Sequence, residues 1–174
     1  MHATDGGGRS VTEGVDPGNF REALSRFPSG VTLVTTRDPS GRPHGYTASA
    51  FASVSAAPPL VLTCLDVGAR CHDVFAATER FGIAILRPDH WDLARRFASK
   101  IEDKFDDTFV ADPFGIFRVP DALAYLACET YQRLPAGDHT ILIGRVVAAE
   151  VADGDPAVFF GRNLRHLREQ VADA

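Results

Sequence analysis

Short apolar runs dominate this sequence, and turn residues rather than long helical patterns separate them. Such runs lie at about 31–37, 45–55, 60–65, 80–87, 123–134 and 139–151, with Pro, Gly, Asp and Asn between them. Helical patterns do not alternate regularly with these runs, which argues against a doubly wound parallel sheet. The pattern predicts a mainly β chain of six or seven strands. We expect an antiparallel Greek-key barrel with two or three short helices outside it.

The individual segments refine this expectation. Pro58 and Pro59 forbid a helix, and the continuous apolar run from Leu60 to Leu65 is typical of a strand buried on both faces. Short helices are expected over 19–27, capped by Asn19, over 69–78 and over 89–100. Segment 101–120 scatters phenylalanines among Asp, Pro and Gly, which indicates a long loop held down by its aromatic rings.

Length and charge exclude several classes of protein. The chain has 174 residues, 45% of them hydrophobic, and a formal net charge of −5. This predicts one domain over 19–174, after a disordered tail over 1–18. The acidic balance argues against nucleic acid as a partner. The sequence shows no secretory signal and no apolar run long enough to cross a membrane, so a cytoplasmic location is expected.

The three cysteines and the histidines predict no metal site. Cys64, Cys71 and Cys128 form no C-x-x-C pair, so we expect reduced thiols. His72 follows Cys71, but further ligands for zinc are missing. The sequence also lacks the G-x-G-x-x-G dinucleotide fingerprint, the P-loop, H-E-x-x-H and G-x-S-x-G. Nothing therefore supports a hydrolase or a kinase.

The run GYTASAFASVS, residues 45–55, is unusual for a strand because nearly all its side chains are small. We expect one strand here. Its alternation puts Thr47, Ser49, Phe51, Ser53 and Ser55 on one face, and Tyr46, Ala48, Ala50, Ala52 and Val54 on the other. Two interpretations stay open. The hydroxyl face is either a solvated face of an edge strand or a wall against which a flat heteroaromatic ring lies.

Two further segments have the chemistry of a ligand site. Asp66–Asp73 follows a buried strand and opens a helix, where backbone amides bind phosphate readily, and Arg70 adds a fork of donors. Lys100 and Lys104 could add charge there, although both are expected at the surface. His139 stands at the mouth of an apolar strand, either as a structural residue or as a functional one.

Five segments of the chain together resemble the flavin reductase-like family with the FMN-binding split barrel. In order, they are FREALSRFPSGVTLVTT, GYTASAFASVSAAPPLVLTCL, FGIAIL, GDHTILIGRV and AVFFGRNLRHL. The similarity covers about residues 19–168 and is nearest to the small reductases of two-component flavin-dependent monooxygenases. The resemblance implies a homodimer of split β-barrels that uses NADH or NADPH to reduce FMN or FAD. The hydride passes to flavin N5, and the reduced flavin serves a separate monooxygenase.

The resemblance also implies which residues bind. The isoalloxazine and ribityl chain would be lined by Tyr46, Thr47, Ala48 and Ser49, with Phe51 and Ala52 close by. The ribityl and phosphate groups would be held by Asp66, Arg70 and Cys71. The nicotinamide would be faced by His139, Phe160 and Arg162. The family often has Ser or Thr where this chain has Cys71, and a tyrosine-rich stretch where it has Phe160–Arg162.

The cofactor supplies the redox chemistry in such a reaction, so no acid–base pair is required and no obligatory catalytic residue is expected. His139 is a candidate for positioning only. Two other functions stay open, namely a flavin-binding module or carrier without turnover, and a pyridoxamine-phosphate-oxidase-like enzyme on a related barrel. The sequence does not choose between FMN and FAD, between NADH and NADPH, or between bound and diffusible flavin.

Overall fold

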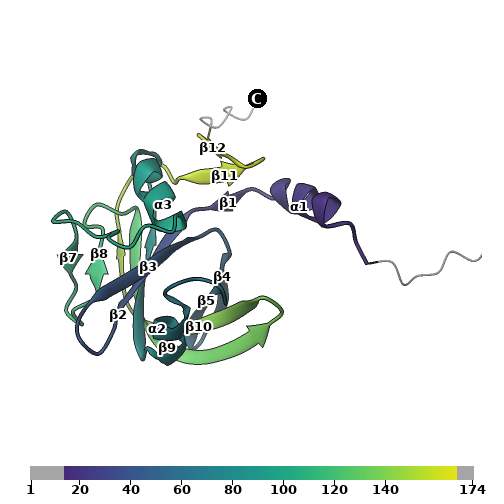
Figure 1. The fold of residues 1–174 in the computed structure, drawn as a ribbon. Coiled ribbons are helices and arrows are strands. Elements are labelled where there is room, and N and C mark those ends of the chain that lie inside the picture. The colour runs from purple at the N-terminus through teal and green to yellow at the C-terminus, as the bar shows by residue number, and fades with distance from the viewer. Residues whose placement is uncertain (1–13, 168–174) are drawn as a thin grey trace, which may run out of the picture.

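The structure is a computed structural model that describes residues 14–167. Its main sheet has seven strands in the order β3-β2-β6-β9-β10-β5-β4, all paired antiparallel. These strands are β2 (Thr32–Arg37), β3 (Pro43–Ala48), β4 (Phe51–Ala56), β5 (Pro59–Asp66), β6 (Arg80–Ile85), β9 (Ala124–Ala136) and β10 (His139–Val151). The sheet curves around a core, as Figure 1 shows. The expected mainly β, antiparallel architecture is confirmed, but the described residues form twelve strands rather than six or seven, and seven of them make the main sheet.

The curved sheet closes where β3 meets β5. The Tyr46 hydroxyl lies 3.4 Å from the Thr63 hydroxyl, so the two strands face each other although neither pairs with the other. Tyr46 also packs edge-on against Phe75, with ring centroids 5.0 Å apart. One of the two buried hydrophobic clusters fills this side of the barrel; the other lies under the helix α3.

Smaller elements surround the barrel. Strands β1 (Ser29–Gly30), β11 (Val158–Phe160) and β12 (Asn163–Arg165) form a three-stranded sheet, and β7 (Val110–Ala111) pairs with β8 (Phe117–Arg118). The helices are α1 (Pro17–Ser25), α2 (His72–Ala77) and α3 (Trp91–Ala98), with a 3-10 turn, η1 (Pro88–His90), before α3. Among the described helices, none is long and apolar enough to cross a membrane.

Helix α3 is the layer that covers β3. Its Ala94 and Phe97 are buried, as its helical spacing predicts. A Cβ at Gly45 of β3 would come within 2.9 Å of the Phe97 ring, so the glycine is what lets the helix lie so close. Phe105 and Phe109 pack on Phe97 with ring centroids 4.9 and 5.6 Å away, which confirms that aromatic rings hold down the loop after α3.

Two predictions about local structure are wrong. The first helix begins at Pro17 rather than after Asn19, because Asp16 is the N-cap and accepts a hydrogen bond from the Asn19 amide at 2.8 Å. Proline suits the first turn, where its missing N–H costs nothing. Residues 45–55 are also not one strand but two, β3 and β4. Of the expected tail, residues 1–13 lie outside the described residues.

Candidate functional site

The break between β3 and β4 lies at Ser49 and Ala50, here called the crossing, and it presents small exposed side chains. Before it, β3 pairs with β2, and the buried Thr32 hydroxyl donates to the Ala48 carbonyl at 2.9 Å. After it, β4 pairs with β5, and the Cys64 amide donates to the Ala50 carbonyl at 3.3 Å. The chain therefore passes from one edge of the sheet to the other at this point, which is next to the end of β5.

Within β3 the expected alternation holds, because Tyr46 and Ala48 face the core and Thr47 faces α3, whereas Phe51 beyond the break packs on the same cluster as Tyr46. Tyr46 and Ala48 are buried in the barrel core, and burial raises the pKa of Tyr46 far above its usual range. The Thr47 hydroxyl donates to the Ala94 carbonyl of α3 at 2.7 Å. These three side chains are therefore not free for a ring. Ser49 and Ala52 are exposed and Phe51 is half-buried, so these three keep the expected accessibility.

The segment from Asp66 to Cys71, here called the turn, continues β5 beyond the crossing. Asp66 folds the turn back on itself, since its carboxylate accepts from the Gly68 amide at 2.6 Å and its carbonyl accepts from the Ala69 amide at 3.0 Å. The carboxylate thus shapes the loop. Within the part of the chain that is described, the amides of Arg70 and Cys71 donate to no other residue.

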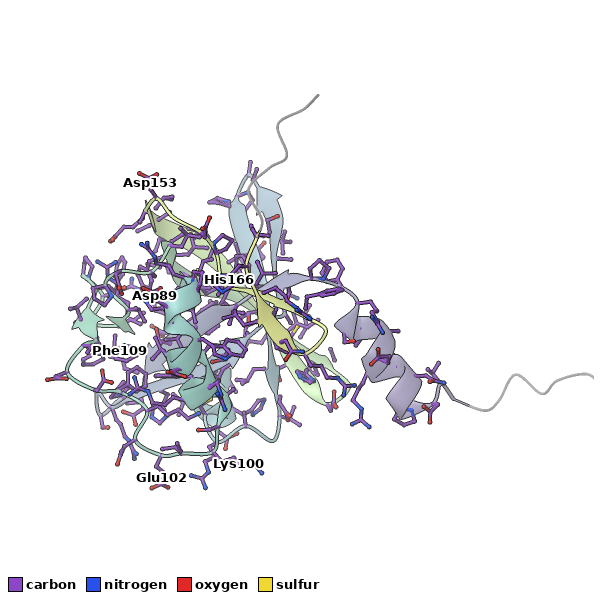
Figure 2. The ribbon with its side chains drawn as sticks, turned by 90° about the horizontal axis from the view of Figure 1, so that it is seen from above. Asp89, Lys100, Glu102, Phe109, Asp153 and His166 are labelled. Atoms are coloured by element: carbon purple, nitrogen blue, oxygen red, sulfur yellow. The ribbon has the colours of Figure 1, made fainter. Side chains whose placement is uncertain are left out.

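Positive charge gathers at this turn. Arg70 is exposed, and its guanidinium lies 3.6 Å from the Glu102 carboxylate on the loop after α3. Figure 2 shows Glu102 beside Lys100 at this end of the molecule. Lys104 is half-buried and donates to the Phe97 carbonyl at 2.8 Å. The sequence predicts Lys104 at the surface. In the structure the side chain is partly covered, because Phe97 packs against Phe105 beside it.

Burial is the main reason that the pKa of Lys104 is lowered, and the nearby charge of Arg70 lowers it further, whereas Cys71 acts in the opposite direction. Burial likewise raises the pKa of the Cys71 thiol, although Lys104 opposes this. Cys71 is thus a neutral thiol next to two cations. It stands at the N-cap position of α2 but makes no side-chain capping bond.

His139 lies beside the same turn. It pairs with Asp66 across the β5–β10 ladder, and the Asp138 carbonyl accepts from the Val67 amide at 3.0 Å. Its Nδ1 lies 2.8 Å from the Asp138 carboxylate, and this hydrogen bond is the main reason that the pKa of Asp138 is lowered. Because an ionised carboxylate only accepts, Nδ1 carries the proton and Nε2 is left as an acceptor.

Phe160 and Arg162 lie in a different place, on the hairpin between β11 and β12. Gly161 and Arg162 have φ values of +57° and +62°, which form the tight turn of this hairpin. Among the described residues, no hydrogen bond or ion pair joins the hairpin to His139. Within one chain, the structure thus groups His139 with the turn and leaves Phe160 and Arg162 beside α1.

Two hollows of the chain lie away from these residues. One, of about 480 Å³, is lined by residues that include Asp89, His90, Arg96 and Asp121. The other, of about 720 Å³, lies between α2 and the β2–β3 turn. Neither contains the crossing. Because Ser49, Ala50 and Ala52 are all exposed, the surface at the crossing is open to solvent.

The first hollow holds a group of possible metal ligands, Asp89, His90 and Asp121, with ligand atoms within 4.8 Å of one another. Their contacts favour a hydrogen-bonded cluster. His90 Nδ1 accepts from the Arg87 amide at 3.3 Å, so Nε2 carries the proton and donates to Asp121 at 3.2 Å. A ring in this tautomer offers no lone pair to a metal.

Comparisons with known proteins agree on one family. Residues 24–168 match the family model described as the flavin reductase like domain. The chain is 46% identical over 154 residues to the actinorhodin polyketide dimerase of Streptomyces coelicolor, covering 87% of each chain. It is 35% identical over 159 residues to the reductase component of the 4-nitrophenol 4-monooxygenase/4-nitrocatechol 2-monooxygenase of Rhodococcus opacus, covering 91% of this chain and 85% of the relative.

A solved structure is similar over nearly the whole chain. It is the NADH:FAD oxidoreductase SgcE6 of Streptomyces globisporus, in complex with NAD and FAD fragments. The TM-score is 0.84 at 34% identity, covering 93% of this chain and 100% of that chain.

Proposed function

The chain belongs to the flavin reductase-like family, and from that premise we propose that its crossing, its turn and Lys104 together bind the flavin. It is an NAD(P)H-dependent flavin oxidoreductase on a split-barrel fold, and it supplies reduced flavin to a monooxygenase. One observation carries the proposed site. Small exposed side chains at the crossing lie directly beside a turn with two free amides and two cations.

The residues present fit a flavin phosphate ester. Ser49, Ala50 and Ala52 leave space above the sheet for a flat ring, and Phe51 offers an apolar edge beside them. The free amides of Arg70 and Cys71 and the charges of Arg70 and Lys104 suit a phosphate. Asp66 contributes by shaping the turn, and Cys71 contributes its amide rather than its neutral thiol.

Bound flavin supplies the redox chemistry, because its N5 accepts a hydride from reduced nicotinamide without help from an acid–base pair. The protein has to hold the two rings in contact and to exclude misaligned poses. Thr47 serves this purpose by tying β3 to α3. Tyr46 and Ala48 fill the core beneath the crossing and so hold its backbone in place.

His139 is proposed to position the nicotinamide. Its Nε2 accepts hydrogen bonds, and the carboxamide of nicotinamide has an N–H₂ group to donate. Asp138 holds the imidazole in this tautomer. Phe160 and Arg162 are proposed to contact the same nucleotide from the β11–β12 hairpin. SgcE6 is an NADH:FAD oxidoreductase, and we propose NADH as the preferred donor here as well.

The enzyme is further proposed to work as a homodimer in the cytoplasm, with the oxygenase as its only macromolecular partner besides its own copy. The alternative is a carrier that binds flavin without turnover. The open crossing favours the enzyme, because a site that must release reduced flavin has no use for an enclosed pocket.

The direct test is an anaerobic assay with NADH or NADPH and FMN or FAD in all four combinations. We expect flavin-dependent loss of absorbance at the reduced-nicotinamide band, fastest with NADH. A reaction without flavin gives the background. If absorbance is lost no faster than this background in every combination, the protein is not a flavin reductase. A yellow protein that shows no turnover would support the alternative of a flavin carrier.

A His139→Ala variant tests the nicotinamide assignment. We expect KM for NADH to rise several-fold while the dissociation constant of the flavin changes little. His139→Gln keeps an acceptor oxygen and should restore part of the loss. Unchanged KM and kcat in the alanine variant would remove His139 from this role.

A further inference from the structure

The imidazole of His72 joins the end of the turn to strand β10. His72 follows Cys71 directly and is the first residue of α2. Its Nε2 lies 3.0 Å from the Thr140 hydroxyl, and its Nδ1 lies 3.2 Å from the Asp73 carboxylate. Because an ionised carboxylate only accepts, Nδ1 donates to Asp73 and Nε2 accepts from the Thr140 hydroxyl. The His72 side chain is 20% exposed, so the ring is largely covered.

This bridge fixes the N-terminal end of α2. The helix has six residues, and Cys71 at its N-cap makes no side-chain hydrogen bond. So short a helix is marginal by itself and depends on contacts with the rest of the fold. At the other end, the buried Phe75 ring packs on Tyr46, and Arg133 of β9 donates to the Phe75 carbonyl at 3.2 Å. Of the described residues that begin α2, only His72 makes a side-chain hydrogen bond to another element.

The turn is attached to the β9–β10 hairpin on both sides of its free amides. On one side, the Val67 amide donates to the Asp138 carbonyl at 3.0 Å. On the other side, the His72 ring meets the Thr140 hydroxyl. The two free amides of the turn lie between these attachments, so the direction of their N–H groups depends on both.

We propose that His72 is a positioning residue for the phosphate of the flavin. This role rests on the proposed function, which places the phosphate at the amides of Arg70 and Cys71. A hydrogen bond prefers an N–H···O angle above about 150°, so these amides bind a phosphate oxygen well only while the turn keeps its orientation. The bridge from His72 to Thr140 maintains that orientation. His72 itself makes no contact with the flavin, so it is not a catalytic residue.

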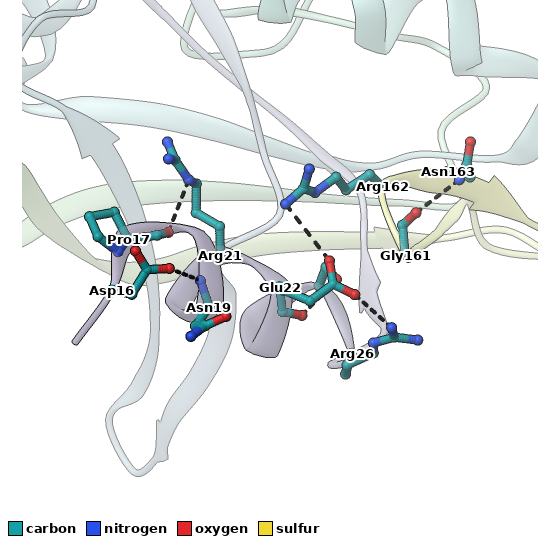
Figure 3. Close-up of polar contacts among 10 residues, drawn as sticks. Asp16, Pro17, Asn19, Arg21, Glu22, Arg26, Gly161, Arg162 and Asn163 are labelled. Atoms are coloured by element: carbon teal, nitrogen blue, oxygen red, sulfur yellow. Dashed lines mark hydrogen bonds and ion pairs between the residues drawn. The ribbon is translucent and has the colours of Figure 1, made fainter.

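The nicotinamide side of the site is held by other contacts. The Asp138 carboxylate orients the His139 ring at 2.8 Å. The β11–β12 hairpin is held by α1, since the Arg162 guanidinium lies 3.9 Å from the Glu22 carboxylate (Figure 3). Neither contact involves His72. Loss of the bridge should therefore weaken flavin binding without changing how the protein binds NADH.

The first test compares FMN with riboflavin, which lacks the phosphate, by fluorescence titration of the full-length protein. In His72→Ala and in Thr140→Val we expect the dissociation constant of FMN to rise about tenfold, because hydrogen bonds to a charged group are lost or misaligned. The dissociation constant of riboflavin should stay within about twofold. His72→Gln keeps an acceptor oxygen for Thr140 and should restore part of the FMN affinity. Unchanged FMN affinity in both variants, or an equal loss for FMN and riboflavin, would overturn the proposal.

A second comparison isolates the bridge itself. If His72 and Thr140 act through one hydrogen bond, the variant with both substitutions binds FMN about as weakly as either single variant. A loss of about a hundredfold, the product of the two single losses, would show that they act separately and would also overturn the proposal. His44→Ala is the matched control and should leave FMN affinity unchanged. His44 is 21% exposed and lies 3.1 Å from the Asp38 carboxylate, at the end of β3 away from the crossing.

Hydrogen exchange without flavin covers the case in which His72→Ala does not fold. Thr140→Val leaves the sequence of the turn unchanged, so its exchange rates compare directly with those of the wild type. The Ala69 and His72 amides donate within the turn region, to the Asp66 and Ala69 carbonyls. We expect both amides to exchange several-fold faster in Thr140→Val, and the Val67 amide to change little. Equal rates at Ala69 and His72 in the two proteins would show that the bridge does not hold the turn.

Steady-state kinetics separates this role from the proposed function. In His72→Ala we expect KM for FMN to rise about tenfold, while KM for NADH and kcat at saturating FMN stay within about twofold. A wild type that neither binds nor reduces flavin contradicts the proposed function, and the role of His72 at the phosphate with it. A wild type that reduces FMN, beside His72→Ala and Thr140→Val proteins with the same KM for FMN, contradicts the role of His72 alone.

Discussion

Ser49 is the residue on which the proposed flavin surface depends most directly. Its side chain is exposed at the crossing, where a ring would approach the backbone. Ser49→Leu fills that space with an isobutyl group, and we expect the dissociation constant of FMN to rise about tenfold or more, which corresponds to about 1.4 kcal/mol. Quenching of flavin fluorescence measures it. Ala111→Leu adds the same bulk on β7 and should leave the affinity unchanged; a flavin affinity unaffected by Ser49→Leu would show that the ring lies elsewhere.

Lys104 makes a second prediction at this scale. A half-buried ammonium beside Arg70 suits a phosphate, so Lys104→Met should weaken FMN binding about tenfold and leave riboflavin, which has no phosphate, almost unaffected. Titrations with both flavins measure the difference. Lys100→Met removes an exposed lysine from the same loop and is the matched control. An equal loss for FMN and riboflavin would show that Lys104 acts through the fold.

These two residues also show how far sequence reasoning reaches. The small side chains of 45–55 could be identified from composition alone, and their exposure at the crossing agrees with a ligand surface. The opposite faces of Tyr46 and Thr47 agree with the predicted alternation, but the sequence does not reveal that one face meets the core and the other meets α3, because both contacts join segments far apart in the chain. The partial burial of Lys104 depends on how the loop after α3 folds back onto Phe97, seven residues earlier, and no periodicity in this loop indicates that contact.

At the scale of elements, the contact between β3 and α3 holds the crossing in place. The Thr47 hydroxyl donates to the Ala94 carbonyl, and Phe97 lies over Gly45. Thr47→Val keeps the shape but removes this hydrogen bond, so we expect the free energy of unfolding to fall by about 1 kcal/mol. Urea denaturation measures it, and Thr47→Ser should retain most of the stability.

The same variant separates two roles for Thr47. The resemblance placed its side chain against the flavin, whereas the structure directs the hydroxyl to α3. We therefore expect the flavin affinity of Thr47→Val to stay within about twofold of the wild type, which is under 0.5 kcal/mol. A large loss of affinity with unchanged stability would restore the first assignment.

Elements differ in how well the sequence predicts them. The hairpin of β9 and β10 follows from two apolar runs around PAGD, and the β2–β3 hairpin follows from PSGR, since both pairings are local. The pairings of β2 with β6 and of β6 with β9 join segments that are far apart in the sequence. No periodicity encodes such partners. The three-stranded sheet that carries Phe160 and Arg162 was missed for the same reason.

At the scale of the whole molecule, the proposed flavin site lies on an open face rather than in a hollow, and this affects how easily flavin exchanges. The barrel core is closed by Tyr46 and Thr63, so it has no room for a ring, and the proposed flavin surface lies outside it. The order of elements along the chain was predictable, and with it the family. The open face could not be predicted from the sequence, because it depends on how the main sheet closes and on which of its edge strands meet.

An open face predicts that flavin exchanges freely, as a diffusible substrate does. We expect protein purified without added flavin to be nearly colourless after gel filtration. Added FMN should then raise the melting temperature in a concentration-dependent way, because a ligand that binds only the folded state at about 100 times its dissociation constant stabilises it by about 2.7 kcal/mol. For a domain of this size, that corresponds to a shift of about 5–10 °C.

Calorimetry with FMN, FAD and riboflavin measures the shift, and lumichrome, which lacks the ribityl phosphate, is the control that should give less. Flavin retained in equal amount to protein through gel filtration would contradict a diffusible substrate and would instead favour a carrier with a tightly held cofactor.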